Sequence, residues 1–184
     1  MFETNTYAVL DVPEPHASAV MQVRVRHRDD FRSSLPVEIT VAGSNGVGEF
    51  ELGQDAEEVF AILATIAADT QPIAASFGRV DRFPGTDIFF LAVEDERPFH
   101  ELHRRIASSP IRFKSCPFPY QPHCTLRDRT PITDEEIADL LAVSIPGSFA
   151  LSTLSIYAMP PPMPLLHRVD LGYGERDDIE GRGV

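Results

Sequence analysis

Residues 121–126, QPHCTL, repeat the pattern of residues 36–41, PVEITV. In each segment a titratable side chain, His123 in one and Glu38 in the other, precedes a threonine by two positions, with one apolar residue between them. Successive side chains of a β-strand point to opposite faces of the sheet. We therefore expect two strands that bury apolar residues on one face and present a titratable group and a threonine on the other.

The order of elements around these two strands also repeats. A helix, a strand with the threonine pattern, a helix that begins with a capping box and two further strands are expected over residues 16–94 and again over residues 97–173. A pseudo-twofold axis between two such halves brings the two motif strands together. The repeat therefore predicts one cleft that receives the polar side chains of both motifs. These are Glu38, Thr40, His123 and Thr125.

Hydrophobic periodicity and turn residues predict the individual elements. Residues 16–31 fit a helix and a strand equally well, and we favour a helix because only Pro-Glu-Pro-His is available for a turn after the preceding strand. Capping residues indicate that two helices begin at Asp55, with Glu58, and at Thr133, with Glu136. The other predictions are a helix over residues 97–108 and strands over residues 7–12, 36–42, 73–83, 87–94, 122–127, 148–159 and 165–173.

The composition indicates a globular chain with a strong negative charge. The 184 residues include 43% apolar and 24% charged side chains, and the formal net charge is −12. Such a field repels a polyphosphate backbone, so a long nucleic acid is not expected as a partner. Between residues 104 and 129, however, basic residues outnumber acidic ones, which suits a local anion site. Without a signal-peptide pattern or a long apolar run, the protein is expected to be soluble and cytoplasmic, with no membrane partner.

The motifs resemble those of the 2H phosphoesterase superfamily, which includes 2′-5′ RNA ligase-like proteins and cyclic phosphodiesterases. The resemblance rests on PHCTL after a proline-aromatic run, on YAVLDVPEP near the N-terminus, on the strand LPVEITV and on the internal repeat. It implies an α+β fold with two lobes, built from duplicated antiparallel sheets with flanking helices around a central cleft. Residues 1–174 are then a single two-lobed domain, and residues 175–184 an acidic C-terminal tail.

The same resemblance implies a phosphodiesterase-like protein that uses general acid/base catalysis and needs no metal or other cofactor. Its expected ligand is a small cyclic or linear phosphodiester, of the nucleoside 2′,3′-cyclic phosphate type, or a nucleotide. His123 and Glu38 take the two catalytic positions. The alternative is a catalytically silent member that binds a ligand or a partner. The residues expected to bind substrate are Thr40, Thr125, Tyr120 and Arg127.

Glu38 stands where the family has a histidine, and this changes the chemistry expected of the first motif. An unperturbed glutamate has a pKa near 4.3, so its carboxylate is a weaker base than imidazole. The ionised group also repels a phosphate, by roughly 4 kcal/mol at ~4 Å and an effective dielectric of about 20. Three outcomes are open: Glu38 is a protonated donor when ligand is bound, it accepts a proton with a large loss of rate, or the chemistry is lost.

Two further features near the second motif have competing interpretations. His100 and His103 stand about one helical turn apart, but without another evident ligand we interpret them as part of a solvated helix face rather than as a metal site. Tyr120 is placed either to stack on a base or to pack among the neighbouring prolines.

Overall fold

The computed structural model describes residues 1–129, 131–159 and 162–172, so the predicted tail at residues 175–184 lies outside it. Its strands are β1 (Thr6–Asp11), β2 (Glu38–Ala42), β3 (Ile73–Arg82), β4 (Phe89–Val93), β5 (His123–Arg127), β6 (Ser148–Leu151), β7 (Thr153–Ala158) and β8 (Leu165–Asp170). Its helices are α1 (His16–Arg26), α2 (Asp30–Ser33), α3 (Ala56–Ala68), α4 (Arg97–Ala107) and α5 (Asp134–Leu141).

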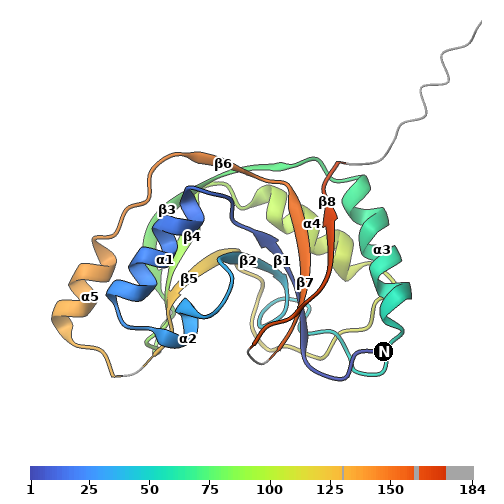
Figure 1. The fold of residues 1–184 in the computed structure, drawn as a ribbon, viewed down its shortest axis with the longest axis horizontal. Helices are drawn as coiled ribbons and strands as arrows, with labels where there is room; N and C mark the ends of the chain where they lie inside the picture. The colour runs from blue at the N-terminus through green and yellow to red at the C-terminus, as the bar shows by residue number, and fades with distance from the viewer. Residues whose placement is uncertain (130, 160–161, 173–184) are drawn as a thin grey trace, which may run out of the picture.

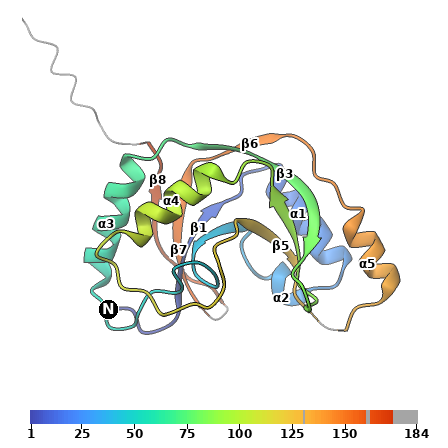
Figure 2. The ribbon, with the colours of Figure 1, turned by 180° about the vertical axis from the view of Figure 1, so that it is seen from behind.

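The strands form two antiparallel sheets in an α+β fold with two lobes, as predicted. The first lobe contains the sheet β2-β1-β7-β8 with helices α3 and α4, and the second contains the sheet β5-β4-β3-β6 with α1, α2 and α5 (Figures 1 and 2). Each sheet combines strands from both halves of the chain, because the β3–β4 hairpin pairs with β5 and β6 while β7 pairs with β1. Each lobe is therefore completed by the other half of the sequence.

This exchange brings the two motif strands together. β2 and β5 are the edge strands of their sheets, and they lie next to each other where the lobes meet (Figure 1). The predicted alternation is present on both strands: Ile39 and Cys124 are fully buried, whereas Glu38 and His123 are only half-buried. The internal repeat thus places two titratable side chains at the junction of the lobes.

Several local predictions are confirmed. Helix rather than strand is confirmed for residues 16–31, but as two helices, α1 and the short α2, with a break at residues 27–29. β3 and β4 form the antiparallel hairpin expected across Pro84-Gly85, and Gly85 has a φ of 72°, which favours glycine. Asp55 accepts the backbone N–H groups of Glu57 and Glu58 at the beginning of α3, and α5 begins with the complete capping box predicted for it.

The prediction of one strand over residues 148–159 is wrong. β6 pairs with β3 in the second lobe, whereas β7 pairs with β1 and β8 in the first, so the chain crosses between lobes at this segment. The buried positions explain the break: Phe149 and Leu151 are buried before it, and Leu154 and Ile156 after it. The buried positions are odd-numbered before the break and even-numbered after it. A single regular strand would therefore turn one of the two sets of apolar residues away from the core.

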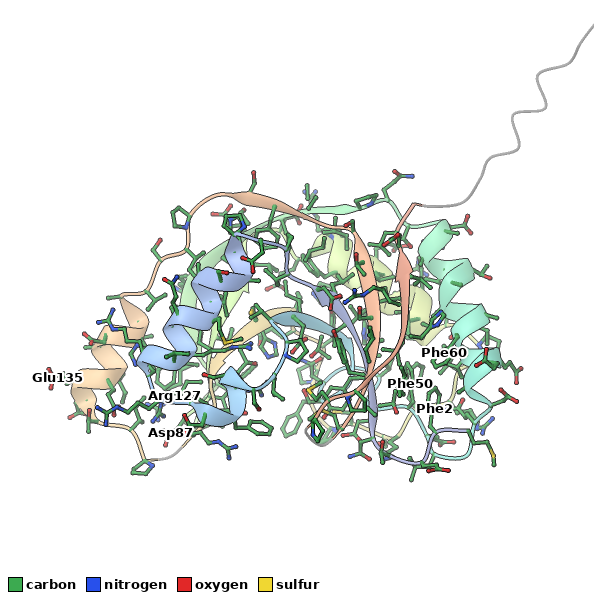
Figure 3. All side chains as sticks on the ribbon, viewed as in Figure 1. Phe2, Phe50, Phe60, Asp87, Arg127 and Glu135 are labelled. Atoms are coloured by element: carbon green, nitrogen blue, oxygen red, sulfur yellow. The ribbon has the colours of Figure 1, made fainter. Side chains whose placement is uncertain are left out.

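The hydrophobic core extends through both lobes (Figure 3). Near the N-terminus, Phe2 packs against Phe50 and Phe60 with ring centroids 5.5 and 5.9 Å apart. These rings pack α3 and the loop before it onto the first lobe. Among the described residues no helix combines the length and apolarity that crossing a bilayer requires.

Candidate active site

A cavity where the lobes meet receives the polar side chains of both motifs. Glu38 and Thr40 reach it from β2, and His123 and Thr125 reach it from β5. Its volume of about 90 Å³ is well below the ~300–1,000 Å³ of pockets that enclose a drug-sized ligand, so it fits the reacting group of a substrate rather than a whole nucleotide. The other lining residues are Tyr7, Phe31, Arg32, Leu35, Pro36, Ser44, Met159 and Met163.

His123 is held in one tautomer by the backbone. Its Nδ1–H donates to the carbonyl oxygen of Gln121 at 2.7 Å, since a carbonyl can only accept, and this leaves the Nε2 lone pair available. The rings of Phe83 and Phe90 pack against the imidazole, each with its centroid 5.1 Å away. Burial lowers the pKa of His123, and the hydrogen bond to Gln121 opposes this only in part. The site therefore favours a neutral imidazole that can accept a proton.

Glu38 is shifted in the opposite direction. Its Oε2 accepts the hydroxyl of Thr40 at 3.0 Å. Burial raises the pKa of Glu38; the guanidinium groups of Arg32 and Arg24 oppose the rise, and the carboxylate of Asp11 adds to it. The environment therefore favours the protonated carboxyl group. A titratable pair whose environments favour an acid on one residue and a base on the other is typical of acid/base sites.

Arg32 places a positive charge at this cavity. It lies on α2, and the N-cap residue Asp29 accepts its backbone N–H at 2.8 Å. Its guanidinium binds the carboxylate of Asp128, just after β5, at 2.8 Å. Asp29 also accepts the backbone N–H of Asp128 at 2.9 Å. These contacts attach α2 to the end of the second motif strand and hold the guanidinium beside the cavity.

A fully buried arginine connects the segments that carry the two motifs. Arg24 of α1 donates from Nε and Nη2 to the carbonyl oxygen of Thr125, at 3.1 and 2.9 Å. Its Nη1 donates to the carbonyl oxygens of Arg32, Leu35 and Pro36, which precede β2, at 3.0, 3.3 and 3.1 Å. The rigid guanidinium fork therefore fixes the distance between the two motif strands.

The sequence match is consistent with this geometry. A sequence model of the 2′-5′ RNA ligase superfamily matches residues 12–159, a range that includes both motifs. The chain belongs to the 2′-5′ RNA ligase superfamily. This confirms the resemblance to the 2H phosphoesterases. A comparison with curated protein sequences finds no match.

Solved structures with the fold of this 2′-5′ RNA ligase superfamily member include those of two bacterial proteins. TT0787 of Thermus thermophilus is similar with a TM-score of 0.64 at 16% identity, over 91% of this chain and 98% of that one. Escherichia coli LigT complexed with 3′-AMP is similar with a TM-score of 0.57 at 17% identity, over 91% of this chain and 97% of LigT. The complex of LigT with NADP+ gives 0.55 at 17% identity, over 92% and 98%. These likenesses establish the shared fold.

In this superfamily member Tyr120 contacts β2 but is not among the residues that line the cavity. Its hydroxyl donates to the carbonyl oxygen of Thr40 at 3.2 Å, and its ring stacks on that of His103 at 3.9 Å with an interplanar angle of 1°. The Nδ1–H of His103 donates to the carbonyl oxygen of Val41 at 2.8 Å. His103 is thus half-buried rather than part of a solvated face, while His100 is exposed as expected. The contacts of Tyr120 fit its packing interpretation, because they support the first motif strand.

Arg127 does not reach the cavity. It is buried in the second lobe (Figure 3), where its guanidinium donates to the carbonyl oxygens of His27, Arg129 and Pro131. The other basic residues between residues 104 and 129 do not line the cavity either. Among the described residues, Arg32, from the first half of the chain, is the arginine that lines the cavity.

Sequence reasoning missed the lining residues outside the motifs. Arg32 carries one local signal, since Asp29 stands at the N-cap spacing before it. Tyr7 reaches the cavity because β1 pairs with β2, and its hydroxyl donates to Glu49 at 3.1 Å. Met159 follows β7, and no local pattern distinguishes it. Within the described ranges, no three His, Cys, Asp or Glu side chains are grouped to hold a metal ion.

Proposed function

We propose that this protein hydrolyses a small cyclic or linear phosphodiester, of the nucleoside 2′,3′-cyclic phosphate type, by general acid/base catalysis. The observation that carries the proposal is the common cavity of both motifs with Arg32 beside them. Membership of the 2′-5′ RNA ligase superfamily supports it, and LigT, which shares the fold, has been solved with 3′-AMP and with phosphate. The net charge of −12 favours a small substrate over a long nucleic acid.

In the proposed reaction His123 is the general base and Glu38 is the general acid. The Nε2 of His123 takes a proton from a water molecule while the water oxygen forms a bond to phosphorus. The bond from phosphorus to the leaving ribose oxygen breaks, and that oxygen takes the proton of Glu38. The products are a phosphomonoester, an imidazolium and a carboxylate. Proton exchange with solvent restores His123 and Glu38.

The remaining site residues stabilise the charge on the phosphoryl group. Arg32 supplies a positive charge beside the cavity, and the hydroxyl of Thr125 is a donor from the second motif strand. Thr40 donates to Glu38, but its hydroxyl can rotate to a phosphoryl oxygen when Glu38 carries its own proton. A protonated Glu38 also removes the repulsion of roughly 4 kcal/mol that an ionised one exerts on the substrate.

This assignment predicts a bell-shaped dependence of rate on pH. The rate falls with rising pH as Glu38 ionises, and its raised pKa moves that limb upward. The rate falls with falling pH as His123 is protonated, and its lowered pKa moves that limb downward. Because the pKa of Glu38 is raised and that of His123 is lowered, both shifts increase the fraction of the protein that carries a protonated Glu38 and a neutral His123 at the same pH.

A catalytically silent protein that binds a nucleotide without turnover is the second candidate. The observation in its favour is the hydrogen bond from Thr40 to Glu38, because the polar groups of the first motif satisfy one another. When the Thr40 hydroxyl donates to Glu38, the first motif has fewer hydrogen-bond donors available for a phosphate.

One experiment separates the two candidates. The purified full chain is incubated with a panel of nucleoside 2′,3′-cyclic phosphates, and phosphomonoester is followed by 31P NMR. Thermal shifts with the matching nucleoside monophosphates are measured in parallel. Turnover that is lost in His123→Ala but kept in the control His100→Ala, an exposed histidine, supports the hydrolase. A thermal shift without turnover supports the silent binding protein.

A further inference from the structure

Asp11 is a second carboxyl group at the first motif. It stands directly opposite Glu38 in the register of β1 and β2. Side chains paired in this way project from the same face of the sheet, with Cβ atoms about 4.5–5.5 Å apart. Two ionised carboxylates at this separation repel each other, so one proton shared between them is favoured.

The two oxygens of Asp11 have different surroundings. Oδ2 accepts the hydroxyl of Ser155 at 2.7 Å and Nη2 of Arg168 at 3.0 Å, both from strands on the far side of β1. Oδ1 is buried and accepts no hydrogen bond among the described residues. A buried acceptor without a donor is costly, and a protonated Glu38 is the donor that the strand register brings near.

We propose that Asp11 and Glu38 form a carboxyl pair that shares one proton, with the negative charge on Asp11 and the proton on Glu38. Arg168 and Ser155 stabilise the charge on Asp11, and the protonated carboxyl group of Glu38 donates a hydrogen bond to Oδ1 of Asp11. Asp11 is then a positioning residue that keeps the acid in its protonated form until the leaving oxygen takes the proton. The inference rests on the proposed function for this catalytic use of the proton, but not for the existence of the pair.

Apart from Asp11, the groups on the elements around Glu38 either favour its ionised form or carry no charge. Arg32 of α2 and Arg24 of α1 favour the carboxylate, and burial of Glu38 outweighs them. The remaining neighbours are neutral: burial raises the pKa of Tyr7, of Tyr120 and of Cys124, the last to about 11, and lowers that of His123. Among the charges that shift the pKa of Glu38, Asp11 supplies the negative one that raises it.

The test is a titration of Glu38 that needs no substrate. The full chain is labelled with 13C in the glutamate side-chain carboxyl groups, and Glu38→Gln assigns the Glu38 resonance. In Asp11→Asn the titration of Glu38 is expected to move down by about one pH unit, since a neighbouring negative charge is lost. In Arg168→Gln the titration of Glu38 is expected to move up, because the guanidinium that offsets the negative charge of Asp11 is lost.

The control is Asp170→Asn, which removes a carboxylate from β8 that stands opposite Thr153 rather than Glu38. It should leave the Glu38 titration unchanged. Opposite shifts in Asp11→Asn and Arg168→Gln support the pair, because a general loosening of the sheet moves both in one direction. Shifts in the same direction, or an Asp11→Asn titration equal to that of Asp170→Asn, overturn it.

The titration also separates the pair from the proposed function. If Asp11→Asn does not fold, Arg168→Gln alone tests the pair, because the Arg168 side chain is half exposed. A Glu38 titration that is unchanged in Arg168→Gln then contradicts the pair. Phosphodiester turnover with an unmoved titration overturns the pair and leaves the function standing. Opposite shifts without turnover support the pair in a silent protein.

Discussion

Glu38→His is expected to raise phosphodiesterase activity at neutral pH by about 10² to 10⁴, the usual contribution of a positioned acid or base. Glutamate ionises from a reference pKa of 4.5, so even with its raised value Glu38 loses its proton as pH rises, whereas imidazole titrates near neutrality. The cavity of about 90 Å³ forces a phosphate close to residue 38. Removing a repulsion of roughly 4 kcal/mol corresponds to about 10³ in rate, which lies within that range. Asp11, opposite position 38, also stabilises an imidazolium there.

The assay is kcat/KM for a nucleoside 2′,3′-cyclic phosphate from pH 4 to 9, with both proteins shown to be folded. The gain should be largest at the high end of this range, because Glu38 ionises as pH rises, and it should shrink as pH falls and Glu38 takes up its proton. His123→Ala should abolish activity in both backgrounds. If folded Glu38→His is slower at every pH on a diester that the unaltered chain cleaves, the expected gain is wrong and Glu38 has a catalytic role that imidazole cannot take over.

The remaining predictions concern two arginines and the stability of the protein. Arg24→Met should lower the free energy of unfolding by about 3–5 kcal/mol in urea denaturation, because four carbonyl oxygens lose their donor. Arg26→Met, at an exposed position, should change it little. Equal effects of the two substitutions contradict the role of Arg24 in connecting the motif segments. Arg32→Gln should raise KM and weaken binding of inorganic phosphate measured by calorimetry, with Arg26→Gln as control; unchanged affinity excludes Arg32 from the anion site. Because the pKa of Glu38 is raised in the folded state, the unaltered chain loses stability as pH rises from 4.5 through the folded pKa. In denaturation curves Glu38→Gln should therefore become more stable relative to the unaltered chain across that pH range. A stability difference between the two proteins that is independent of pH contradicts this prediction.

The sequence predicted the motif strands well because their signal is local. Two-residue spacing puts Glu38 with Thr40 and His123 with Thr125 on single faces, and the capping pair Thr133 and Glu136 fixes the beginning of α5 without any tertiary contact. The internal repeat added the one long-range prediction that the structure supports, the meeting of both motifs in one cavity.

The surroundings of the motifs depend on pairings that periodicity does not reveal. Ser155 and Arg168 reach Asp11 only because β7 and β8 cross to the first lobe and continue the sheet beyond β1. Arg127 shows the reverse case: its place in a basic stretch suggested an anion site, but buried carbonyl oxygens of the second lobe take its guanidinium. Charge counted along the chain does not predict which charges a fold brings together.

The proposed function requires His123 and Glu38 to act together on a phosphodiester in one cavity. The most direct measurement compares the rate of phosphomonoester release from one nucleoside 2′,3′-cyclic phosphate, at the pH optimum, for the unaltered chain, His123→Ala, Glu38→Gln and the control His100→Ala. We expect the rate to fall by about 10² to 10⁴ in His123→Ala and in Glu38→Gln and to be unchanged in His100→Ala. A His123→Ala protein that is folded and releases phosphomonoester as fast as the unaltered chain contradicts the claim.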